Sequence, residues 1–344
     1  MKAQTQNQIN FFRTLTVRRI WNMVKVYLSF HLSKATKKPI QWGMPFSISV
    51  EPTTSCNLRC PECPSGLRSF TRPTGMLQTE MFSTIIDQVY KHVNYLTFYF
   101  QGEPYLHKEF LEMVNYARSK KIYTATSTNA HYLNDAMAKK TIESGLDRLI
   151  ISIDGTSQET YKQYRVGGKL DKVIQGAKNV VKWKKKLNSP TPYIIFQFLV
   201  VKPNEHQVED VKDLAREIGV DEVILKTAQV YDYEHGNSLI PENEKYSRYK
   251  KLDDGTYAIK NVLENSCWKL WHSCVVTWDG KIVPCCFDKD AQYKLGDLKN
   301  TSFRDIWWGE AYHDFRTKLV RSRKEIDICK NCSEGCEVNM KYDF

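Results

Sequence analysis

From residue 46 onward, short apolar runs alternate with longer stretches in which apolar residues recur every three or four positions. The short runs are rich in Ile, Val, Tyr, Phe and Thr, a composition typical of buried or half-buried strands. We predict six strands, at residues 46–51, 95–100, 122–127, 148–153, 193–201 and 222–226. The stretches between them predict five helices, at residues 79–92, 108–120, 134–144, 170–186 and 207–218.

Strand–helix alternation favours parallel strands joined by right-handed crossovers, as in α/β proteins. Six such units are too few for a closed eight-stranded barrel, so we expect an open or partial (β/α)6 TIM-like barrel. In parallel barrels the chemistry lies at the carboxyl ends of the strands. The loops that directly follow the predicted strands are therefore the places to look for functional residues.

The pattern changes after residue 230. Residues 231–265 are polar and Tyr-rich without clear periodicity, which predicts a connector. Two β-type runs then flank Asp279-Gly280, a pair typical of tight hairpin turns. Five of the eight Trp residues fall within residues 268–308 and predict a small aromatic core. We therefore expect an N-terminal extension, a barrel, a connector and a small cysteine-rich α+β extension, at residues 1–45, 46–230, 231–265 and 266–344.

The N-terminal extension contains an amphipathic helix candidate with basic residues on its other faces. Its apolar residues recur at helical spacing: Val17, Ile20, Trp21, Val24 and Leu28. Such a helix can contact an anionic membrane surface, but packing against the barrel is the commoner arrangement and is our expectation. Charged residues interrupt every candidate membrane span, and the polar first dozen residues lack the apolar core of a signal peptide. We therefore expect a cytoplasmic protein.

Composition and charge narrow the class of protein further. The 344 residues are 42% hydrophobic and 26% charged, which excludes a disordered chain. Fifty Lys and Arg against 39 Asp and Glu give a formal net charge of +11. The densest basic run, within residues 182–186, is most simply the solvated end of a helix. No zinc-finger, helix-turn-helix or RNA-binding signature accompanies it, so we expect no nucleic-acid partner.

The ten cysteines are grouped along the chain. Three are Cys56, Cys60 and Cys63, none falls within residues 64–266, and seven follow from Cys267 onward. Because no export signal is visible, metal ligation or redox chemistry explains them better than disulfides. The first group has the spacing CxxxCxxC directly after the first predicted strand. Three thiolates on one loop can hold three irons of a [4Fe–4S] cluster and leave the fourth iron open. A zinc site with a fourth ligand from elsewhere is the alternative.

At these cysteines the chain resembles the radical S-adenosylmethionine (SAM) superfamily, which has CxxxCxxC in this loop of a partial barrel. The stretch 101–104 resembles the family's GGEP motif, which contacts the SAM amino group. Residues 127–129 and 152–155 resemble stretches that bind the SAM ribose and carboxylate. The resemblance implies eight cofactor-binding residues: Gly102, Glu103, Pro104, Ser127, Asn129, Ser152, Asp154 and Arg165. The chain departs from the family at Glu62, where an aromatic residue usually precedes the third cysteine.

The resemblance also implies a mechanism. The SAM amino and carboxylate groups would bind the open iron, and one-electron reduction would break the C5′–S bond to give methionine and a 5′-deoxyadenosyl radical. That radical would abstract a hydrogen atom from a substrate. The cofactor supplies the difficult chemistry, while the protein orients it and excludes water.

The C-terminal cysteines resemble the SPASM or shorter Twitch extension of radical SAM enzymes, which carries auxiliary [4Fe–4S] clusters. Seven cysteines, two of them adjacent, fit one auxiliary cluster better than two. Two flank the predicted hairpin and two form a CxxC pair, and these are the ligands that we expect: Cys267, Cys285, Cys329 and Cys332. Three others stay open as ligands or buried thiols: Cys274, Cys286 and Cys336. A structural zinc site is the alternative for this group.

The leading hypothesis is therefore a radical SAM oxidoreductase or maturase with two [4Fe–4S] clusters. Family analogy suggests a peptide, protein or small-molecule substrate and a flavodoxin- or ferredoxin-type electron donor, which the basic charge would attract. An N-terminal extension of about 45 residues is short for the leader-peptide-binding domain of many peptide maturases, which disfavours crosslinking of ribosomal peptides. The alternative from another class is a non-catalytic iron–sulfur or zinc protein for electron transfer or scaffolding.

Overall fold

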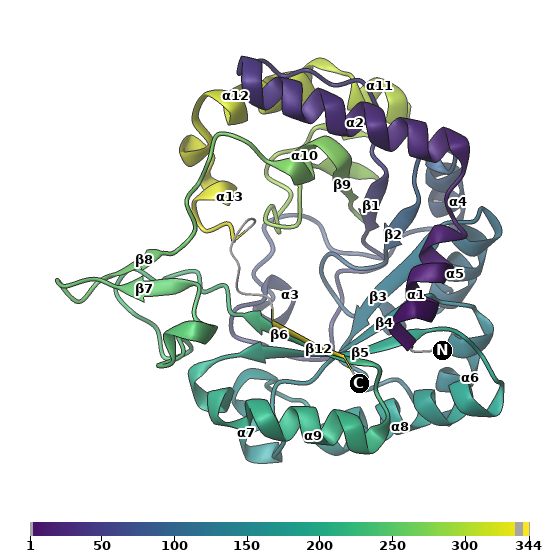
Figure 1. Cartoon of the computed structure of the whole chain (residues 1–344), viewed down its shortest axis with the longest axis vertical. Coiled ribbons are helices and arrows are strands. Elements are labelled where there is room, and N and C mark those ends of the chain that lie inside the picture. Colours follow the sequence, from purple (N-terminus) through teal and green to yellow (C-terminus); the bar gives the residue numbers. More distant parts are fainter. Residues whose placement is uncertain (1–2, 334–339, 344) are drawn as a thin grey trace.

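The computed structural model describes residues 3–333 and 340–343. Its centre is a ten-stranded sheet with the order β11-β10-β9-β1-β2-β3-β4-β5-β6-β12 (Figure 1). The six predicted barrel strands are β1 Ser47–Val50, β2 Tyr95–Thr97, β3 Tyr123–Thr128, β4 Arg148–Ser152, β5 Tyr193–Val200 and β6 Glu222–Thr227. Each pairs in parallel with the next. Over the described residues the sheet ends at β11 and β12 instead of closing, so the predicted α/β partial barrel is confirmed.

All five predicted helices are present and cover the outer face of the sheet (Figure 1). They are α4 Thr79–Val89, α5 Phe110–Ser119, α6 Asp135–Glu143, α8 Leu170–Lys186 and α9 Val208–Ile218. Their apolar sides share one core with the outward-facing strand residues, such as Leu96 and Phe98 of the β2 segment. The sequence did not predict α3 Pro64–Leu67 or α7 Gln158–Tyr164. Both are too short to show an apolar period, although α7 buries Tyr161 and Tyr164.

The C-terminal part of the chain extends the same sheet at both edges. On one side β9 Ser273–Val276 pairs in parallel with β1, and β10 Lys281–Val283 and β11 Gly296–Asp297 follow antiparallel. On the other side β12 Met340–Asp343 pairs antiparallel with β6. The predicted hairpin is therefore present as β9 and β10. Four helices accompany it: α10 Trp268–His272, α11 Phe303–Trp307, α12 Glu310–Ser322 and α13 Asp327–Lys330.

Shorter elements fill the connections. The connector contains a two-stranded ribbon, β7 Tyr249–Lys251 and β8 Tyr257–Ile259, which projects from one side of the molecule (Figure 1). The polar sequence of this region gave no sign of these strands. Four 3-10 turns complete the fold: η1 Pro104–Leu106, η2 Lys202–Gln207, η3 Glu244–Tyr246 and η4 Arg323–Glu325.

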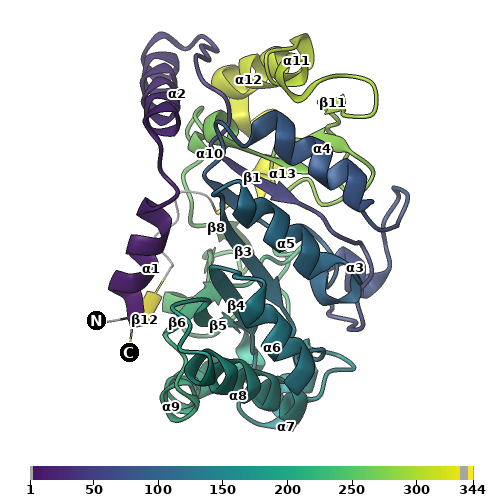
Figure 2. The same cartoon turned by 90° about the vertical axis from the view of Figure 1, so that its right-hand side faces the viewer.

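Two N-terminal helices, α1 Ala3–Phe12 and α2 Val17–Thr36, run along one side of the molecule (Figure 2). In α1, Asn7 accepts a hydrogen bond from the Tyr123 hydroxyl at the start of β3. The expected helix α2 does pack against the rest of the chain, through a mostly polar side that includes Val26, while the predicted apolar stripe faces outward. The expectation that the apolar stripe would pack on the barrel is therefore wrong. Among the described residues, no helix is both long enough and apolar enough to span a membrane.

Candidate active site

The three cysteines of CxxxCxxC lie on the loop that leaves β1. Cys63 precedes the first residue of α3, and Pro64 at that first position needs no hydrogen-bond acceptor for a backbone N–H. The loop folds back tightly, because a Cβ on Gly66 would lie 2.5 Å from the backbone nitrogen of Cys60. Cys56, Cys60 and Cys63 together line a cavity of about 190 Å³ at the carboxyl end of the barrel strands. Burial raises the pKa of the Cys56 thiol to about 11.

The stretch 101–104 closes one side of this cavity. Gly102 has a φ of +76°, and a Cβ there would lie 2.2 Å from the carbonyl oxygen of Thr53, so both conformation and space require glycine. Its N–H donates to the Ser65 hydroxyl in α3 at 2.9 Å, which ties the stretch to the cysteine loop. Gln101, in the place of the family's first glycine, has its side-chain oxygen 3.9 Å from the Cys63 sulfur.

Glu103 is buried, and none of the hydrogen bonds described for its carboxylate comes from a cationic side chain. Its carboxylate accepts hydrogen bonds from the Thr128 hydroxyl and the Asn129 N–H, each at 2.7 Å, and from the Tyr105 N–H at 3.3 Å. Burial raises the pKa of Glu103, and these donors partly oppose the rise. The carboxylate is thus held rigidly beside the cavity, where a cationic ligand group would relieve its desolvation.

Polar side chains from β3 and β4 face the same cavity. The Asn129 amide donates to the side-chain oxygen of Asn57 at 2.8 Å and lies 3.9 Å from the Cys56 sulfur. The Ser127 and Ser152 hydroxyls are 3.4 Å apart. These residues end adjacent parallel strands, so the barrel geometry brings them together although 25 residues separate the two serines.

Arg165 brings a positive charge to the cysteine loop. It follows directly after α7, and its Nε donates to the fully buried carboxylate of Asp154. Asp154 also accepts a hydrogen bond from the Leu199 N–H at 2.7 Å, so the carboxylate that binds Arg165 is itself fixed in position. The Nη1 atom of Arg165 lies 3.9 Å from the Cys60 sulfur. Burial raises the pKa of the Cys60 thiol, and the guanidinium partly offsets this rise.

Six of the eight residues predicted to bind SAM line the cavity: Gly102, Glu103, Ser127, Asn129, Ser152 and Arg165. Pro104 and Asp154 lie behind this lining, where Pro104 begins η1 and Asp154 holds Arg165. Six further lining residues were not among the predicted SAM contacts, although Thr128 lies within the predicted stretch 127–129: Leu58, Ser65, Gly66, Tyr99, Thr128 and Tyr164. Strand alternation could have identified Tyr99. Because its neighbours Phe98 and Phe100 are buried, Tyr99 faces the opposite side of the sheet from them.

The second cysteine group comes together from three segments. Cys285 lies within electrostatic range of Cys267 and Cys329, and Cys329 lies within range of Cys332. Burial, followed by the neighbouring thiols, raises the pKa of Cys285. Arg323 donates a hydrogen bond to the Cys332 sulfur at 3.2 Å. All four cysteines that the sequence singled out here are therefore neighbours.

The remaining cysteines differ in their surroundings. Cys286 packs near Phe100, and its sulfur accepts a hydrogen bond from the Lys269 ammonium at 3.5 Å. Cys274 is fully buried in β9 beside the Tyr312 hydroxyl, as a small apolar core residue would be. Cys336 lies outside the described residues.

A cavity of about 520 Å³ is lined by sequence neighbours of both cysteine groups, Pro64 beside Cys63 and Ile328 beside Cys329. Its wall combines the start of α3, the connector, the segment after β10 and α13. Lys289 stands on this wall and donates to the Tyr231 hydroxyl at 3.2 Å. It lies within electrostatic range of both Cys63 and Cys286, and burial lowers its pKa. Glu62, the residue at the family's aromatic position, accepts the backbone N–H of Tyr231 at 3.0 Å and thereby fixes this wall.

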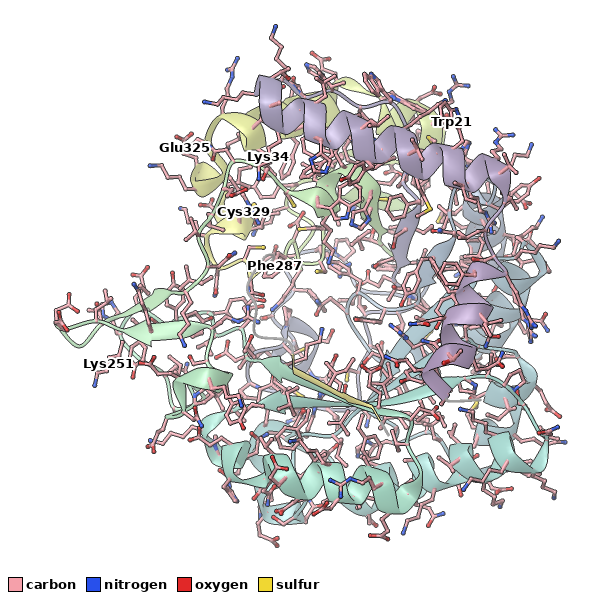
Figure 3. The ribbon with its side chains drawn as sticks, in the orientation of Figure 1. Trp21, Lys34, Lys251, Phe287, Glu325 and Cys329 are labelled. Carbon is pink, nitrogen blue, oxygen red and sulfur yellow. The ribbon has the colours of Figure 1, made fainter. Side chains whose placement is uncertain are left out.

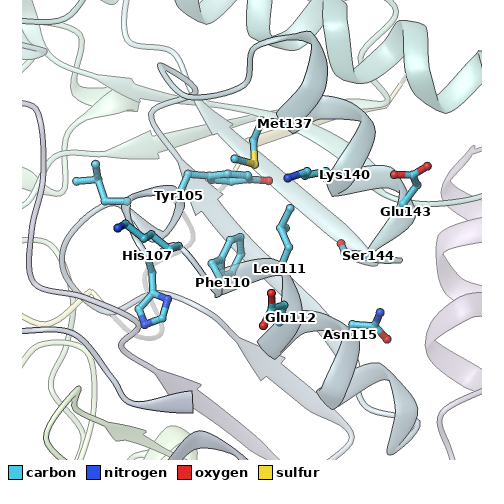
Figure 4. Close-up of a pocket in the computed structure, with 12 residues that line it drawn as sticks. Tyr105, His107, Phe110, Leu111, Glu112, Asn115, Met137, Lys140, Glu143 and Ser144 are labelled. Carbon is cyan, nitrogen blue, oxygen red and sulfur yellow. The ribbon is translucent and has the colours of Figure 1, made fainter.

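A third cavity, of about 530 Å³, lies between η1, α5 and α6 (Figure 4). Its lining includes Tyr105, His107, Met137 and Glu143, and none of its lining residues is a cysteine. It opens on the helical layer outside the sheet rather than at the strand ends. By contrast, the 190 Å³ cavity is lined by cysteines and the 520 Å³ cavity by sequence neighbours of cysteines, so we assign the candidate active site to these two.

Comparison with known families decides the class of this protein. The model of the radical SAM superfamily matches residues 50–216, and the model of the SPASM iron–sulfur cluster-binding domain matches residues 267–333. The chain belongs to the radical SAM superfamily. Radical SAM enzymes with a SPASM domain use SAM, a SAM-binding [4Fe–4S] cluster and auxiliary clusters, and these are therefore its cofactors.

Relatives of this radical SAM enzyme have varied names. The chain is 26% identical to the tungsten-containing aldehyde ferredoxin oxidoreductase cofactor-modifying protein of Pyrococcus furiosus, over 84% of this chain and 88% of that one. It is 28% identical to the AdoMet-dependent heme synthase of Methanosarcina barkeri, over 76% and 82%. These enzymatic relatives do not favour the alternative of a non-catalytic metal protein.

Solved structures show the same fold. Streptococcus suis SuiB bound to S-adenosylmethionine superposes with a TM-score of 0.64 at 14% identity, covering 90% of this chain and 76% of that one. The enzyme anSMEcpe with bound AdoMet gives a TM-score of 0.62 at 18% identity, covering 86% and 88%. The donor chemistry of the first cavity also fits the cofactors: three thiols for iron, a buried carboxylate for an amino group and a guanidinium for a carboxylate.

Proposed function

We propose that this radical SAM enzyme abstracts a hydrogen atom from a substrate bound in the 520 Å³ cavity lined by sequence neighbours of both cysteine groups. The observation that carries this proposal is the position of that cavity, whose wall includes Pro64 beside Cys63 and Ile328 beside Cys329. A substrate there borders the radical-generating loop on one side and the auxiliary cluster region on the other. A volume of this size suits a small molecule or a short peptide segment.

In this proposal each site residue that the sequence predicted has a defined role. Cys56, Cys60 and Cys63 hold the SAM-binding cluster, and Cys267, Cys285, Cys329 and Cys332 hold one auxiliary cluster. Bound together, the first cluster and SAM supply the 5′-deoxyadenosyl radical chemistry of the superfamily. Glu103 accepts hydrogen bonds from the SAM amino group, and Arg165 pairs with the SAM carboxylate. Ser127, Asn129 and Ser152 hydrogen-bond the sugar, while Asp154 and Pro104 keep their neighbours in place.

The protein's own contribution is mainly to orient groups and exclude water. Glu103 and Arg165 are already held by their own hydrogen bonds, so little conformational freedom is lost when a ligand binds. The wall of the 520 Å³ cavity mixes apolar residues, including Phe287 and Ile328, with charged ones such as Lys289, so the bound substrate itself would help to keep water from a reactive intermediate.

The comparisons support two kinds of substrate, a peptide and a smaller molecule. Solved neighbours include SuiB bound to the precursor peptide SuiA and anSMEcpe bound to the Cp18Cys peptide, which supports a peptide substrate. The curated relatives are named as a heme synthase and a cofactor-modifying protein, which supports a smaller substrate. We propose a cytoplasmic enzyme that receives electrons from a flavodoxin or ferredoxin, because small acidic donors are attracted to a chain with a net charge of +11.

Anaerobic reconstitution with iron and sulfide, followed by reduction with SAM, tests the assignment. We expect about eight irons per chain and release of 5′-deoxyadenosine. Cys60→Ala should leave about four irons and abolish 5′-deoxyadenosine, whereas Cys285→Ala should leave about four irons and retain SAM cleavage. Cys286→Ala is the matched control, and it should keep about eight irons. A well-formed, reducible cluster that never cleaves SAM would refute the proposed function.

A further inference from the structure

Helix α2 is held against the protein mainly by polar residues, with Val26 and Phe30 as apolar contacts to the core. The Arg19 guanidinium donates to four backbone carbonyls, among them Thr14 at 2.6 Å, Tyr90 at 2.6 Å and Lys120 at 3.0 Å. These contacts join α2 to the ends of α4 and α5. Burying an arginine in this way is stabilising only because its donors are satisfied.

Two further polar residues repeat the same arrangement along the helix. Asn22 donates to the Met44 carbonyl and accepts the Met44 N–H, both at 2.9 Å. Ser33 exchanges hydrogen bonds with the backbone of Ile40, also at 2.9 Å. Such directional contacts fix the rotation of the helix about its own axis, so the face that α2 presents to solvent is determined.

The solvent-facing side of α2 is apolar. Six residues at helical spacing form what we name the α2 stripe: Val17, Ile20, Trp21, Val24, Leu28 and Leu32. All six are exposed, with Val17 86% and Trp21 59% accessible. The helix runs along the edge of the molecule, with Trp21 near its N-terminal end and Lys34 near the other (Figure 3). A surface helix of a soluble protein normally has the reverse arrangement, with its apolar side buried.

Charge is distributed very unevenly around this stripe. The first 50 residues contain eight Lys and Arg and no Asp or Glu, so they account for +8 of the net charge of +11. The other 294 residues, with 42 basic and 39 acidic side chains, contribute only +3. Arg18 and Lys25 border the stripe directly, and Lys25 lies 5.8 Å from the Trp21 ring. The exposed Phe12, at the end of α1, and Trp42, on the segment that runs back along α2, add aromatic surface.

We propose that α2 docks this enzyme on an anionic membrane surface, with the α2 stripe inserted at the boundary between headgroups and acyl chains. An apolar stripe bordered by basic residues, with Trp at the interface, is the pattern of helices that lie in the membrane plane. The excess of basic charge in this segment selects anionic lipid as the partner, since among its described residues only Lys34, near the C-terminal end of α2, is paired to an acid, Glu264. A second copy of the chain fits poorly, because two such faces would bring two clusters of positive charge together.

Co-sedimentation of the holoenzyme with vesicles tests this proposal. We expect binding to vesicles that contain phosphatidylglycerol and much weaker binding to pure phosphatidylcholine. Leu28→Asp should reduce the partition coefficient at least tenfold, because it places a charge in the buried stripe. Lys25→Gln should reduce it about fivefold, since a basic residue near an anionic surface contributes about 1 kcal/mol.

A matched control separates the stripe from exposed apolar residues in general. Val17→Asp and Val262→Asp change residues of equal type and nearly equal exposure, 86% and 83%, but only the first lies on α2. We expect Val17→Asp to lose binding and Val262→Asp to retain it. Equal binding of both variants, or no binding of the folded wild-type holoenzyme to anionic vesicles, would overturn the proposal. So would light scattering that shows a dimer which Val17→Asp dissociates, because the stripe would then be a protein interface.

Discussion

A buried ion pair joins the barrel to the hairpin that carries Cys285. The Arg72 guanidinium binds both carboxylate oxygens of Glu51, at 2.6 and 2.8 Å, and Glu51 also accepts the Trp278 N–H at 3.2 Å. The side chain of Glu51 is fully buried and that of Arg72 is 7% exposed. Arg72 also donates to the Lys289 carbonyl, so the pair connects the end of β1, the hairpin turn and the wall of the 520 Å³ cavity.

Removing one partner of this pair should cost far more than removing a surface ion pair. Glu51→Gln leaves the guanidinium buried without a counter-charge, and such losses typically lower the free energy of unfolding by about 3–5 kcal/mol. Arg72→Met leaves the carboxylate with only the Trp278 N–H and should cost about as much. The double variant Glu51→Leu/Arg72→Met removes both charges together and should recover most of the loss, because a well-packed apolar pair replaces a buried ion pair at little cost.

Urea unfolding under anaerobic conditions, followed by circular dichroism at equal cluster loading, measures these differences. The control is Glu242→Gln, which breaks an ion pair of similar length to Lys202, 2.7 Å, that is mostly exposed. We expect no resolvable change there. Single variants of the buried pair that each lose less than about 1 kcal/mol would refute the reasoning, as would a double variant whose loss is the sum of the two.

Three other predictions address the site and its surroundings. Gly102→Ala should abolish assembly of the first cluster, because the added Cβ would overlap a backbone carbonyl. Iron analysis measures this, and Gly255→Ala is the control, because Gly255 has a similar positive φ but no atom within 4 Å of an added Cβ. Burial raises the pKa of Asp147 to about 6, because the neutral carboxyl is buried at lower cost than the carboxylate. The stability that comes from the neutral form is fully present below about pH 4 and is lost as the pH rises through 6. Asp147→Asn should therefore unfold at higher urea than wild type at pH 7, and a gap that does not shrink toward pH 4 would contradict this. Lys289→Met removes a cation near Cys63 and Cys286 and should lower the cluster reduction potentials by roughly tens of millivolts. Redox titration with electron paramagnetic resonance measures these potentials, and unchanged values would exclude this electrostatic role.

Much of the fold could be read from local pattern. Buried parallel strands are continuous apolar runs, and helices between them keep an apolar period, so β1 to β6 and the long helices were recoverable. Helix α7 was not, because its seven residues, QETYKQY, contain too few apolar positions to show a period. Its omission matters since α7 delivers Arg165, which only the family resemblance identified.

The orientation of α2 shows a different limit. Hydrophobic periodicity reports that a helix has two unlike faces, and burial of the apolar one is the usual outcome. Here Arg19 and Asn22 bind backbone groups up to 102 and 22 residues away along the chain, and Ser33 binds the segment that folds back on the helix. Hydrogen bonds to distant carbonyls leave no trace in local spacing, so the sequence could not predict which face turns inward.

The two edges of the barrel sheet have a consequence for how the chain can be divided. A parallel sheet cut at β6 would expose unpaired N–H and C=O groups on both β1 and β6, and exposed strand edges recruit other chains. In this protein β9 covers the first edge and β12 the second, so segments that follow all six barrel strands in the sequence complete the sheet. All six barrel strands are therefore synthesised before either edge is protected, which makes the nascent barrel a natural client for chaperones and makes a fragment that stops after β6 prone to aggregation.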